Sequence, residues 1–216
     1  MDPETPLWQT LDQRLNPAGM RILGGLWEAD STLYLIGPDG AQFWPVFQAS
    51  TEYLDNAPDP VDRYSTRTLT AIAAKSGSKA LFPFGGPPYQ PFIEWALRSN
   101  RCFQSPVQLL VHAELGLFTS FRGALRFKGQ HALPSPVPNP CNECEAKPCL
   151  LACPADALNQ THYDVALCHE FLDTKREGSC MARGCAVRRT CPVGQGQRPE
   201  AQSAFHMGYF HKRAAQ

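Results

Sequence analysis

The sequence has no excess of charge of either sign, because 20 Lys and Arg residues balance 20 Asp and Glu residues in a chain of 216. This balance gives no indication of binding to nucleic acid or to an anionic membrane. No apolar run reaches the roughly 18 residues that span a bilayer, and the N-terminal segment has no basic stretch followed by an apolar one. We therefore expect a soluble, cytoplasmic protein with no nucleic-acid and no membrane partner.

Several common catalytic motifs are also missing. The sequence contains no Gly-x-Gly-x-x-Gly fingerprint, P-loop, His-Glu-x-x-His zinc motif or serine elbow. No flavin or nicotinamide site is therefore identified from the sequence. Any electrons that the protein uses are expected to come from a partner, either a flavoprotein or a ferredoxin.

Cysteine is scarce in the first part of the chain and abundant in the second. Residues 1–135 contain only Cys102, whereas residues 141–191 contain eight cysteines. Between them, Leu133–Pro140 has four prolines in eight residues. Proline fixes φ and lacks an N–H donor, so an extended connector is expected there. The sequence thus predicts a module over residues 1–135, a cysteine-rich domain over 136–200 and a C-terminal helix or tail over 201–216.

The first 135 residues alternate strand-like and helix-like patterns, which indicates a mixed α and β module. Asp59-Pro60 is a helix start signal and Gly77 is a stop signal. The expected strands are residues 20–27, 32–37, 107–112 and 117–127, with a hairpin turn at 113–116 joining the last two, and the expected helices are residues 60–75 and 91–98.

The eight clustered cysteines form two runs, and each run ends in Cys-Pro. The first is Cys141-x2-Cys144-x4-Cys149-x3-Cys153-Pro, and the second is Cys168-x11-Cys180-x4-Cys185-x5-Cys191-Pro. The runs resemble bacterial two-cluster ferredoxins, in which the fourth cysteine of each run binds the other cluster. Thiolates are soft anionic ligands that suit iron–sulfur chemistry. The cysteine runs therefore predict two [4Fe–4S] clusters.

The crossover rule of those ferredoxins assigns the cysteines to the two clusters. It gives one cluster to Cys141, Cys144, Cys149 and Cys191, and the other to Cys153, Cys168, Cys180 and Cys185. The gaps of 4, 11 and 5 residues depart from the plain ferredoxin spacing, so the individual assignments stay open. Two zinc sites of four cysteines each are an alternative, whereas disulfides are disfavoured without a secretion signal. Cys102 is expected to be a small buried apolar residue.

Two segments of the first module resemble proteins that process corrinoids. Leu81–Phe92, with the sequence LFPFGGPPYQPF, resembles the proline- and aromatic-rich loop of cobalamin-processing decyanases, and residues 111–125 are similar to their His-Pro-x-x-Gly-x-Trp-x-x-x-Arg-Gly segment. Residues 111–125 are also similar to a strand pair of epoxyqueuosine reductases, which carry a two-cluster domain directly afterwards. Their cluster motif has a lone cysteine where this chain has Cys168.

The resemblance implies an α+β fold in which a reduced nitroreductase-like α/β module precedes a small ferredoxin-like two-cluster domain. It implies a protein that binds a corrinoid, either cobalamin or a precursor, and reduces its cobalt. One alternative is a ferredoxin-like electron carrier without substrate chemistry, and another is a reductase acting on a different substrate. Modification of tRNA is disfavoured, because residues 85–95 have no aspartate where epoxyqueuosine reductases carry their proton donor.

Several residues are candidates for corrinoid binding, and each also has a structural interpretation. The aromatic candidates, which would form an apolar wall, are Phe82, Phe84, Tyr89 and Phe92, and Gly85 and Gly86 would let the backbone approach a flat ligand closely. Arg122 is a candidate partner for a carboxylate, amide or phosphate of the ligand, and His112 is a candidate cobalt ligand or proton donor. In the structural interpretation, the loop covers the core, Arg122 lies on the polar face of a strand, and His112 bonds to the backbone.

Two further groups lie near the cysteines or after them. His206 belongs to a predicted amphipathic helix at 204–210 that packs on the rest of the protein. The basic residues Arg183, Arg188 and Arg189 lie between the cluster cysteines. They are expected to raise the cluster potential, to dock an acidic electron donor, or to face solvent.

Overall fold

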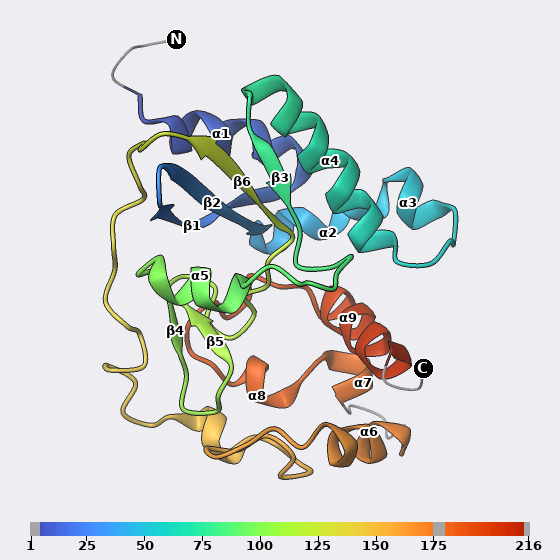
Figure 1. Cartoon of the computed structure of the whole chain (residues 1–216). Helices are drawn as coiled ribbons and strands as arrows, with labels where there is room; N and C mark the ends of the chain where they lie inside the picture. Colours follow the sequence, from blue (N-terminus) through green and yellow to red (C-terminus); the bar gives the residue numbers. More distant parts are fainter. Residues whose placement is uncertain (1–4, 175–179, 214–216) are drawn as a thin grey trace. The chain divides into compact units, whose positions relative to one another are not determined.

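The computed structural model describes residues 5–174 and 180–213 (Figure 1). The chain divides into two units, of which the first comprises residues 1–102 and 120–137 and the second comprises residues 103–119 and 138–216. Helices accompany small antiparallel sheets, so the predicted α+β class is confirmed. Residues 103–119 belong to the second unit, whereas the sequence predicted that all of residues 1–135 form the first module.

A four-stranded antiparallel sheet forms the centre of the first unit, with the strand order β1-β2-β6-β3. Its strands are β1 (Met20–Glu28), β2 (Ser31–Pro38), β3 (Lys79–Leu81) and β6 (Gly123–Lys128). β1 and β2 form a tight hairpin in which Glu28 pairs with Ser31. Seven of the eight β2 residues are buried. Because side chains alternate between the faces of a strand, this burial means that both faces of β2 are covered.

Helices of the first unit pack against this sheet. They are α1 (Leu7–Leu15), the 3₁₀ turn η1 (Asn16–Ala18), α2 (Gly40–Gln48), α3 (Thr51–Leu54), α4 (Pro60–Ser76) and α5 (Phe92–Arg98). α1 and α5 contact β1, whereas α4 contacts β3 and β6. Pro60 occupies the first position of α4, and Gly77 ends the helix in the left-handed region with φ of 66°. The helices predicted at residues 60–75 and 91–98 are confirmed.

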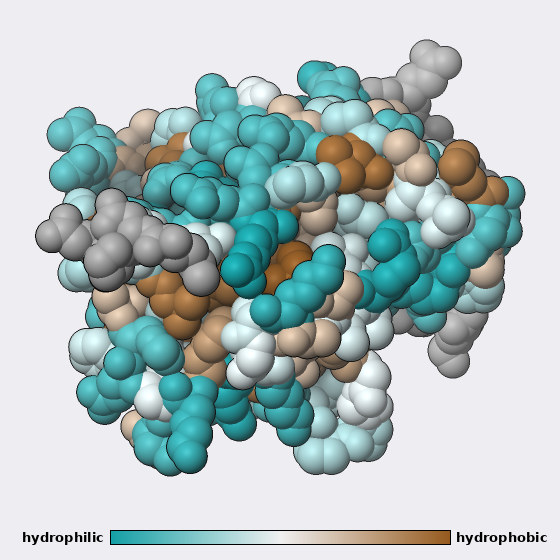
Figure 2. Space-filling model, turned by 90° about the horizontal axis from the view of Figure 1, so that it is seen from above, coloured by the Kyte–Doolittle hydropathy of each residue, from teal (hydrophilic) through white to brown (hydrophobic). Residues whose placement is uncertain are grey.

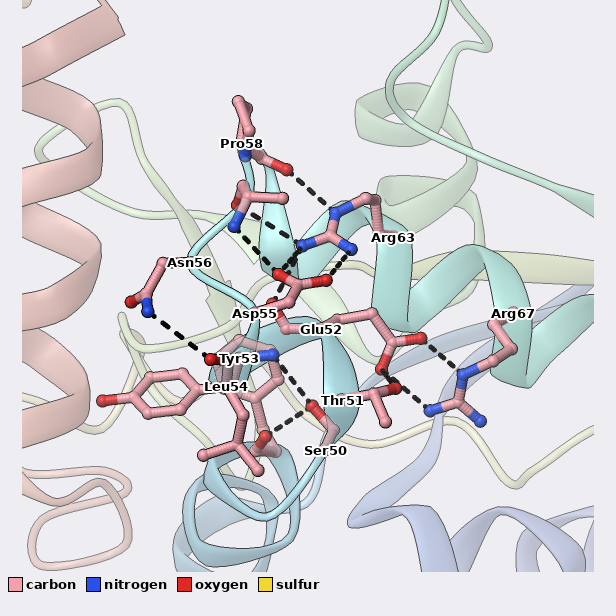
Figure 3. Close-up of polar contacts among 12 residues, drawn as sticks. Ser50, Thr51, Glu52, Tyr53, Leu54, Asp55, Asn56, Pro58, Arg63 and Arg67 are labelled. Atoms are coloured by element: carbon pink, nitrogen blue, oxygen red, sulfur yellow. Dashed lines mark hydrogen bonds and ion pairs between the residues drawn. The ribbon is translucent and has the colours of Figure 1, made fainter.

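Two arginines of α4 hold α3 and the loop that follows it (Figure 3). Arg63 makes a two-pronged contact with the Asp55 carboxylate, at 2.8 and 2.7 Å. Arg67 binds the buried Glu52 carboxylate, with Nη2 3.0 Å from Oε2. The hydrogen bond from Arg67 lowers the pKa of Glu52 from 4.5 to about 2, even though burial opposes this change.

The proline-rich connector runs extended along the first unit, as predicted, because residues 131–139 form neither helix nor strand. Arg101 Nη1 donates to the Ser135 carbonyl at 2.8 Å. The Val137 N–H donates to the Asn100 carbonyl at 3.1 Å. A Cβ added at Gly25 of β1 would lie 3.2 Å from the Leu133 side chain. The missing side chain at Gly25 therefore lets the connector lie close to the sheet.

The second unit is small and carries all the clustered cysteines. Its elements are β4 (Cys102–Gln104), which begins at the last residue of the first unit, β5 (Leu110–His112), the 3₁₀ turn η2 (Pro148–Leu151), α6 (Val165–Asp173), α7 (Cys180–Arg183), α8 (Ala186–Arg189) and α9 (Glu200–Arg213). β4 pairs with β5, α7 contacts α9, and α8 contacts η2. Of the predicted C-terminal helix or tail at 201–216, residues 214–216 lie outside the described residues, and α9 confirms the helix expected at 204–210.

The predicted hairpin of residues 107–112 and 117–127 is wrong. β5 begins only at Leu110 and pairs with β4, around a turn in which the Ser105 N–H donates to the Leu109 carbonyl. β6 begins at Gly123 and lies between β2 and β3 in the other sheet. β2 offers β6 six paired positions, from Ser31 to Ile36, whereas β5 has three residues. Pairing with β2 therefore buries more side chains of β6 than pairing with β5 would. The local sequence pattern of residues 117–127 does not show which of these two strands is the partner.

Residues 103–119 belong to the second unit because of a close backbone contact. Gly116 has φ of +57°, and a Cβ at this position would lie 2.1 Å from the Val193 carbonyl oxygen. Only glycine allows this approach. The cysteine distribution placed the boundary at residue 135 because this segment contains no cysteine of its own to mark it.

Across the two described stretches, no helix has both the length and the apolar character needed to cross a membrane. The face drawn in Figure 2 is mostly hydrophilic, with apolar side chains in small separate groups. Single exposed apolar side chains are normal on protein surfaces. Cys102 is 1% exposed, as expected for a small buried apolar residue.

Candidate metal-cluster sites

Four cysteines line one cavity of the second unit. They are Cys141, Cys144, Cys149 and Cys191, and the remaining wall consists of Ser105, Pro106, Val111, Leu117, Pro140, Lys147, Pro148, Pro192 and Val193. The cavity is partly open to solvent. Apart from the thiols, Lys147 and Ser105, the wall side chains are apolar. We refer to these four residues as the first cysteine set.

The thiols of the first cysteine set lie close enough to affect one another's charge. Burial raises the pKa of Cys141, and the thiolates of Cys191, Cys149 and Cys144 raise it further, whereas Lys147 lowers it. Burial also raises the pKa of Cys149, followed by the thiolates of Cys191 and Cys144. Four thiolates are therefore unfavourable here unless a metal supplies positive charge.

The other four cysteines form a second cysteine set, Cys153, Cys168, Cys180 and Cys185. Burial raises the pKa of Cys168, a hydrogen bond from Tyr163 lowers it, and the thiolates of Cys185, Cys153 and Cys180 raise it. Burial raises the pKa of Cys180, and the thiolates of Cys185 and Cys153 add to this. The structure therefore brings Cys153 to the second run and Cys191 to the first.

Short helical segments position these thiols. Pro148 opens η2 directly before Cys149, and Cys180 is the first residue of α7. Cys168 lies in α6, whose start is fixed because the Asp164 carboxylate accepts the Leu167 N–H at 2.9 Å. A hydrogen bond from the backbone of Ala186 lowers the pKa of Cys180. Backbone donors of this kind stabilise anionic sulfur.

Both cysteine sets pack on one apolar core. Val107, Val111, Leu117, Leu158 and Val187 are buried in it with Cys149 and Cys191. Cys141, Cys153 and Cys185 are partly buried against it. The core therefore covers three thiols of the first set and two of the second, which limits their contact with water.

The hydrogen bonding of Ser105 bears on whether the first cavity can hold a sulfur-containing cluster. This serine is 4% exposed and lines the cavity, and within the described part of the chain its Oγ has no hydrogen-bond partner. A buried hydroxyl without a partner costs about 1–3 kcal/mol. Sulfide or thiolate bound in the cavity would accept a hydrogen bond from it. Four thiols, an apolar wall and one spare donor fit a [4Fe–4S] cluster.

Among the residues that the structure describes, no group of three or more His, Cys, Asp or Glu side chains is arranged to hold a metal ion. A single zinc ion holds thiolate sulfurs about 2.3 Å from one point. A four-iron cluster places iron and sulfide between its thiolates.

No family model matches this chain, and no curated protein matches it.

The aromatic loop of residues 82–91 lies in the first unit. Phe82 and Phe84 stack with their ring centroids 5.3 Å apart. Gly85 has φ of +80°, with no atom within 4 Å of a Cβ built on it, and the side chain of Tyr89 is exposed at 67%. Gly86-Pro87 and Pro87-Pro88 are cis peptides. This loop therefore presents aromatic side chains and open backbone to solvent.

The other residues predicted for a corrinoid site have structural partners. Phe92 is 6% exposed and packs on Trp95 with ring centroids 5.1 Å apart. Arg122 lies directly before β6, not within a strand, and its Nη1 is 3.2 Å from the Asp62 carboxylate. His112 is fully buried in the second unit, where its Nδ1 accepts the Glu114 N–H at 3.1 Å. Within the first unit, only the loop residues from Phe84 to Tyr89 come together at the surface.

The basic residues between the cluster cysteines stabilise the second unit. Arg183 forms an ion pair with Glu200 of α9 at 2.7 Å. Arg188 Nη1 donates to the Leu117 carbonyl, and Arg189 Nε donates to the Gly184 carbonyl at 3.2 Å. His206 is half-buried in α9, the helix that packs on α7.

Sequence reasoning did not identify two hydroxyl groups at the cysteine sets. Ser105 lies far from the cysteines in sequence, and Tyr163 is five residues before Cys168. Serine and tyrosine occur throughout the chain, so their types alone give no signal. The one local indication of a role for Tyr163 is its position directly before Asp164, the N-cap residue of α6.

Proposed function

We propose that this chain is an iron–sulfur electron-transfer protein that binds two [4Fe–4S] clusters, one at each cysteine set. The observation that carries the proposal is the exchange of the last cysteine between the two runs. Cys191 stands with the first cysteine set and Cys153 with the second. This exchange is the arrangement of two-cluster ferredoxins.

Each cluster, when bound, would take up and release one electron at low potential. Eight thiolates would hold the clusters, and the apolar wall of the first cavity, with Val111 and Leu117, would exclude water. Because burial disfavours additional negative charge, this environment would keep the reduction potential low. The backbone donor at Ala186 would offset part of that effect at the second set.

Metal analysis tests the proposal directly. Protein purified without oxygen should absorb broadly near about 400 nm and contain about eight irons and eight sulfides per chain. C141S and C191S should remove the same cluster, leaving one identical paramagnetic signal after reduction, and C153S should remove the other. C102S is the matched control and should keep all the iron. Stoichiometric zinc without iron would disprove the proposal.

A finer proposal concerns the first unit. It would be a reduced nitroreductase-like module beside a ferredoxin-like domain, and its loop of residues 82–91 would bind a corrinoid whose cobalt the protein reduces. The exposure of Tyr89, together with the Phe82–Phe84 stack and the open backbone at Gly85, favours this. Aromatic faces beside open backbone suit a flat macrocycle.

Spectroscopy separates this finer proposal from the alternatives. Cob(II)alamin added to iron-loaded protein should change its absorption on binding, and Y89A should weaken binding about tenfold by removing an aromatic contact. The control L54A changes an exposed apolar residue elsewhere in the same unit. An unchanged corrinoid spectrum would instead favour an electron carrier that receives electrons from a flavoprotein or ferredoxin, or a reductase of another substrate.

A further inference from the structure

Tyr163 is held directly against the second cysteine set. Its phenol O–H donates to Cys168 Sγ at 3.5 Å. Its backbone forms an antiparallel bridge with Leu158. On the other side, its ring stacks on Phe210 of α9, with centroids 6.3 Å apart and planes at 19°. The hydroxyl is therefore positioned by the bridge and by the stacked ring.

The hydroxyl of Tyr163 is a permanent hydrogen-bond donor in this position. A tyrosine phenol has an ordinary pKa of about 10, so it keeps its proton at physiological pH. Its donation lowers the pKa of Cys168, so the bond favours the thiolate form of this cysteine.

We propose that Tyr163 raises the reduction potential of the cluster at the second cysteine set. This inference rests on the proposed function, because it requires a cluster bound to Cys168. A donor to a ligand sulfur withdraws negative charge from the cluster. The reduced cluster carries one more negative charge than the oxidised cluster, so the hydrogen bond stabilises the reduced form more.

The effect is confined to one of the two clusters. The hydroxyl of Tyr163 contacts Cys168, which belongs to the second cysteine set. Tyr163 therefore distinguishes two clusters that share one apolar core. The hydrogen bond from Tyr163 shifts the potential of the second cluster alone, and no proton moves from Tyr163 in the process.

The variant Y163F removes the hydroxyl and keeps the ring that stacks on Phe210. We expect about eight irons to be retained. In a redox titration followed by paramagnetic resonance, one cluster should become harder to reduce. At its wild-type midpoint, the ratio of reduced to oxidised cluster should fall about fivefold, as expected for one hydrogen bond of about 1 kcal/mol. The other cluster should be unchanged, and Y53F, in α3 of the first unit, should alter neither.

Two outcomes would overturn the role of Tyr163 while leaving the two-cluster proposal intact. In the first, Y163F keeps its iron and both midpoints stay at their wild-type values. In the second, Y163F loses about four irons, so that the hydroxyl is needed for assembly and not for tuning. Wild-type protein without iron would instead disprove the proposed function itself, which keeps the two failures distinct.

Discussion

Ser105 has opposite roles in the empty and the loaded protein. Its buried Oγ has no partner among the described residues, and the residue lines the first cavity. Without a ligand, the hydroxyl is a destabilising group, because it has lost its water and gained no acceptor. With the proposed cluster bound, the same hydroxyl would have sulfur available as an acceptor.

The variant S105A should therefore separate these two roles. We expect the metal-free protein to be equally stable or more stable by about 1 kcal/mol, measured by denaturant unfolding. In the iron-loaded protein, the cluster at the first cysteine set should become harder to reduce. S120A removes a similar unpartnered hydroxyl in the first unit and should leave both midpoints unchanged. A first-set midpoint that does not move in S105A would contradict the donor role.

Glu52 gives the first unit a defined sensitivity to acid. Its pKa of about 2 lies below the ordinary 4.5, so its ion pair with Arg67 stabilises the fold above about pH 4.5. This stabilisation is lost as the pH falls from about 4.5 toward 2. Since Arg67 is 57% exposed, we expect a contribution of about 1–2 kcal/mol.

The pH dependence of the variant E52Q tests this contribution. At pH 7, E52Q should unfold with about 1–2 kcal/mol less free energy than wild type. The difference should shrink as the pH falls below about 4.5 and should vanish only below about pH 2, where wild-type Glu52 is protonated too. A difference that stays constant from pH 7 to pH 2 would show that the pair does not act through charge.

At the residue scale, the sequence was informative about the cysteines and silent about their neighbours. Short spacings such as Cys141-x2-Cys144 restrict where the thiols can lie, whatever the rest of the fold does. The partners of Glu52 and the contact of Tyr163 depend on tertiary structure. The same holds for Arg122, whose contact with Asp62 joins residues 60 positions apart.

At the scale of elements, the turn at residues 112–116, which follows β5, lies against one of the cluster cysteines. The His112 and Gly116 backbones bond to each other at 3.0 and 2.9 Å. A Cβ at Gly116 would lie 2.9 Å from Cys191 Sγ as well as 2.1 Å from the Val193 carbonyl. The turn thus covers the end of the second cysteine run.

The variant G116A should be much more harmful than a glycine replacement without neighbours. Gly196 also has a positive φ, of +75°, but a Cβ there would meet no atom within 4 Å. G196A should therefore cost only the conformational penalty of about 1 kcal/mol. G116A should cost about 3 kcal/mol or more, and should release iron from the first set faster. Equal stability of the two variants would contradict the close contact.

Elements with local signals were predicted well, and elements chosen by long-range pairing were not. The helix α4 follows from Pro60 at its start and Gly77 at its end, which act through their own backbone conformations. The partner of β6 could not be predicted, because Gly123–Lys128 pairs with strands far away in the sequence. A run of alternating residues fits any neighbouring strand equally well.

On the scale of the whole molecule, the two units differ in what holds them together. The first has its own apolar core over the sheet, including Tyr34, Leu35, Phe43 and Phe47. The core of the second unit includes Cys149 and Cys191. If the proposed clusters are bound, their binding would be coupled to the folding of the second unit and not of the first.

Removal of iron with a chelator should affect the two units differently. We expect amide hydrogen exchange to become fast over residues 138–174 and 180–193, which carry the eight thiols, and over residues 103–119, which pack with them. Residues of β1, β2 and α4 should keep their protection. Loss of protection in all of these segments together would show that the first unit does not hold its fold alone.

The path of the chain has a consequence for how the cysteine-rich part could be exchanged between proteins. The segment 103–119 enters the second unit before the chain returns to complete the first. A gene fusion that transferred only the residues from Pro138 onward would carry all eight clustered cysteines. It would leave behind Val107, Val111 and Leu117, which belong to the core on which the thiols pack. The cysteine-rich part therefore lacks a complete core when it is transferred without residues 103–119, so the two parts of the chain must be transferred together.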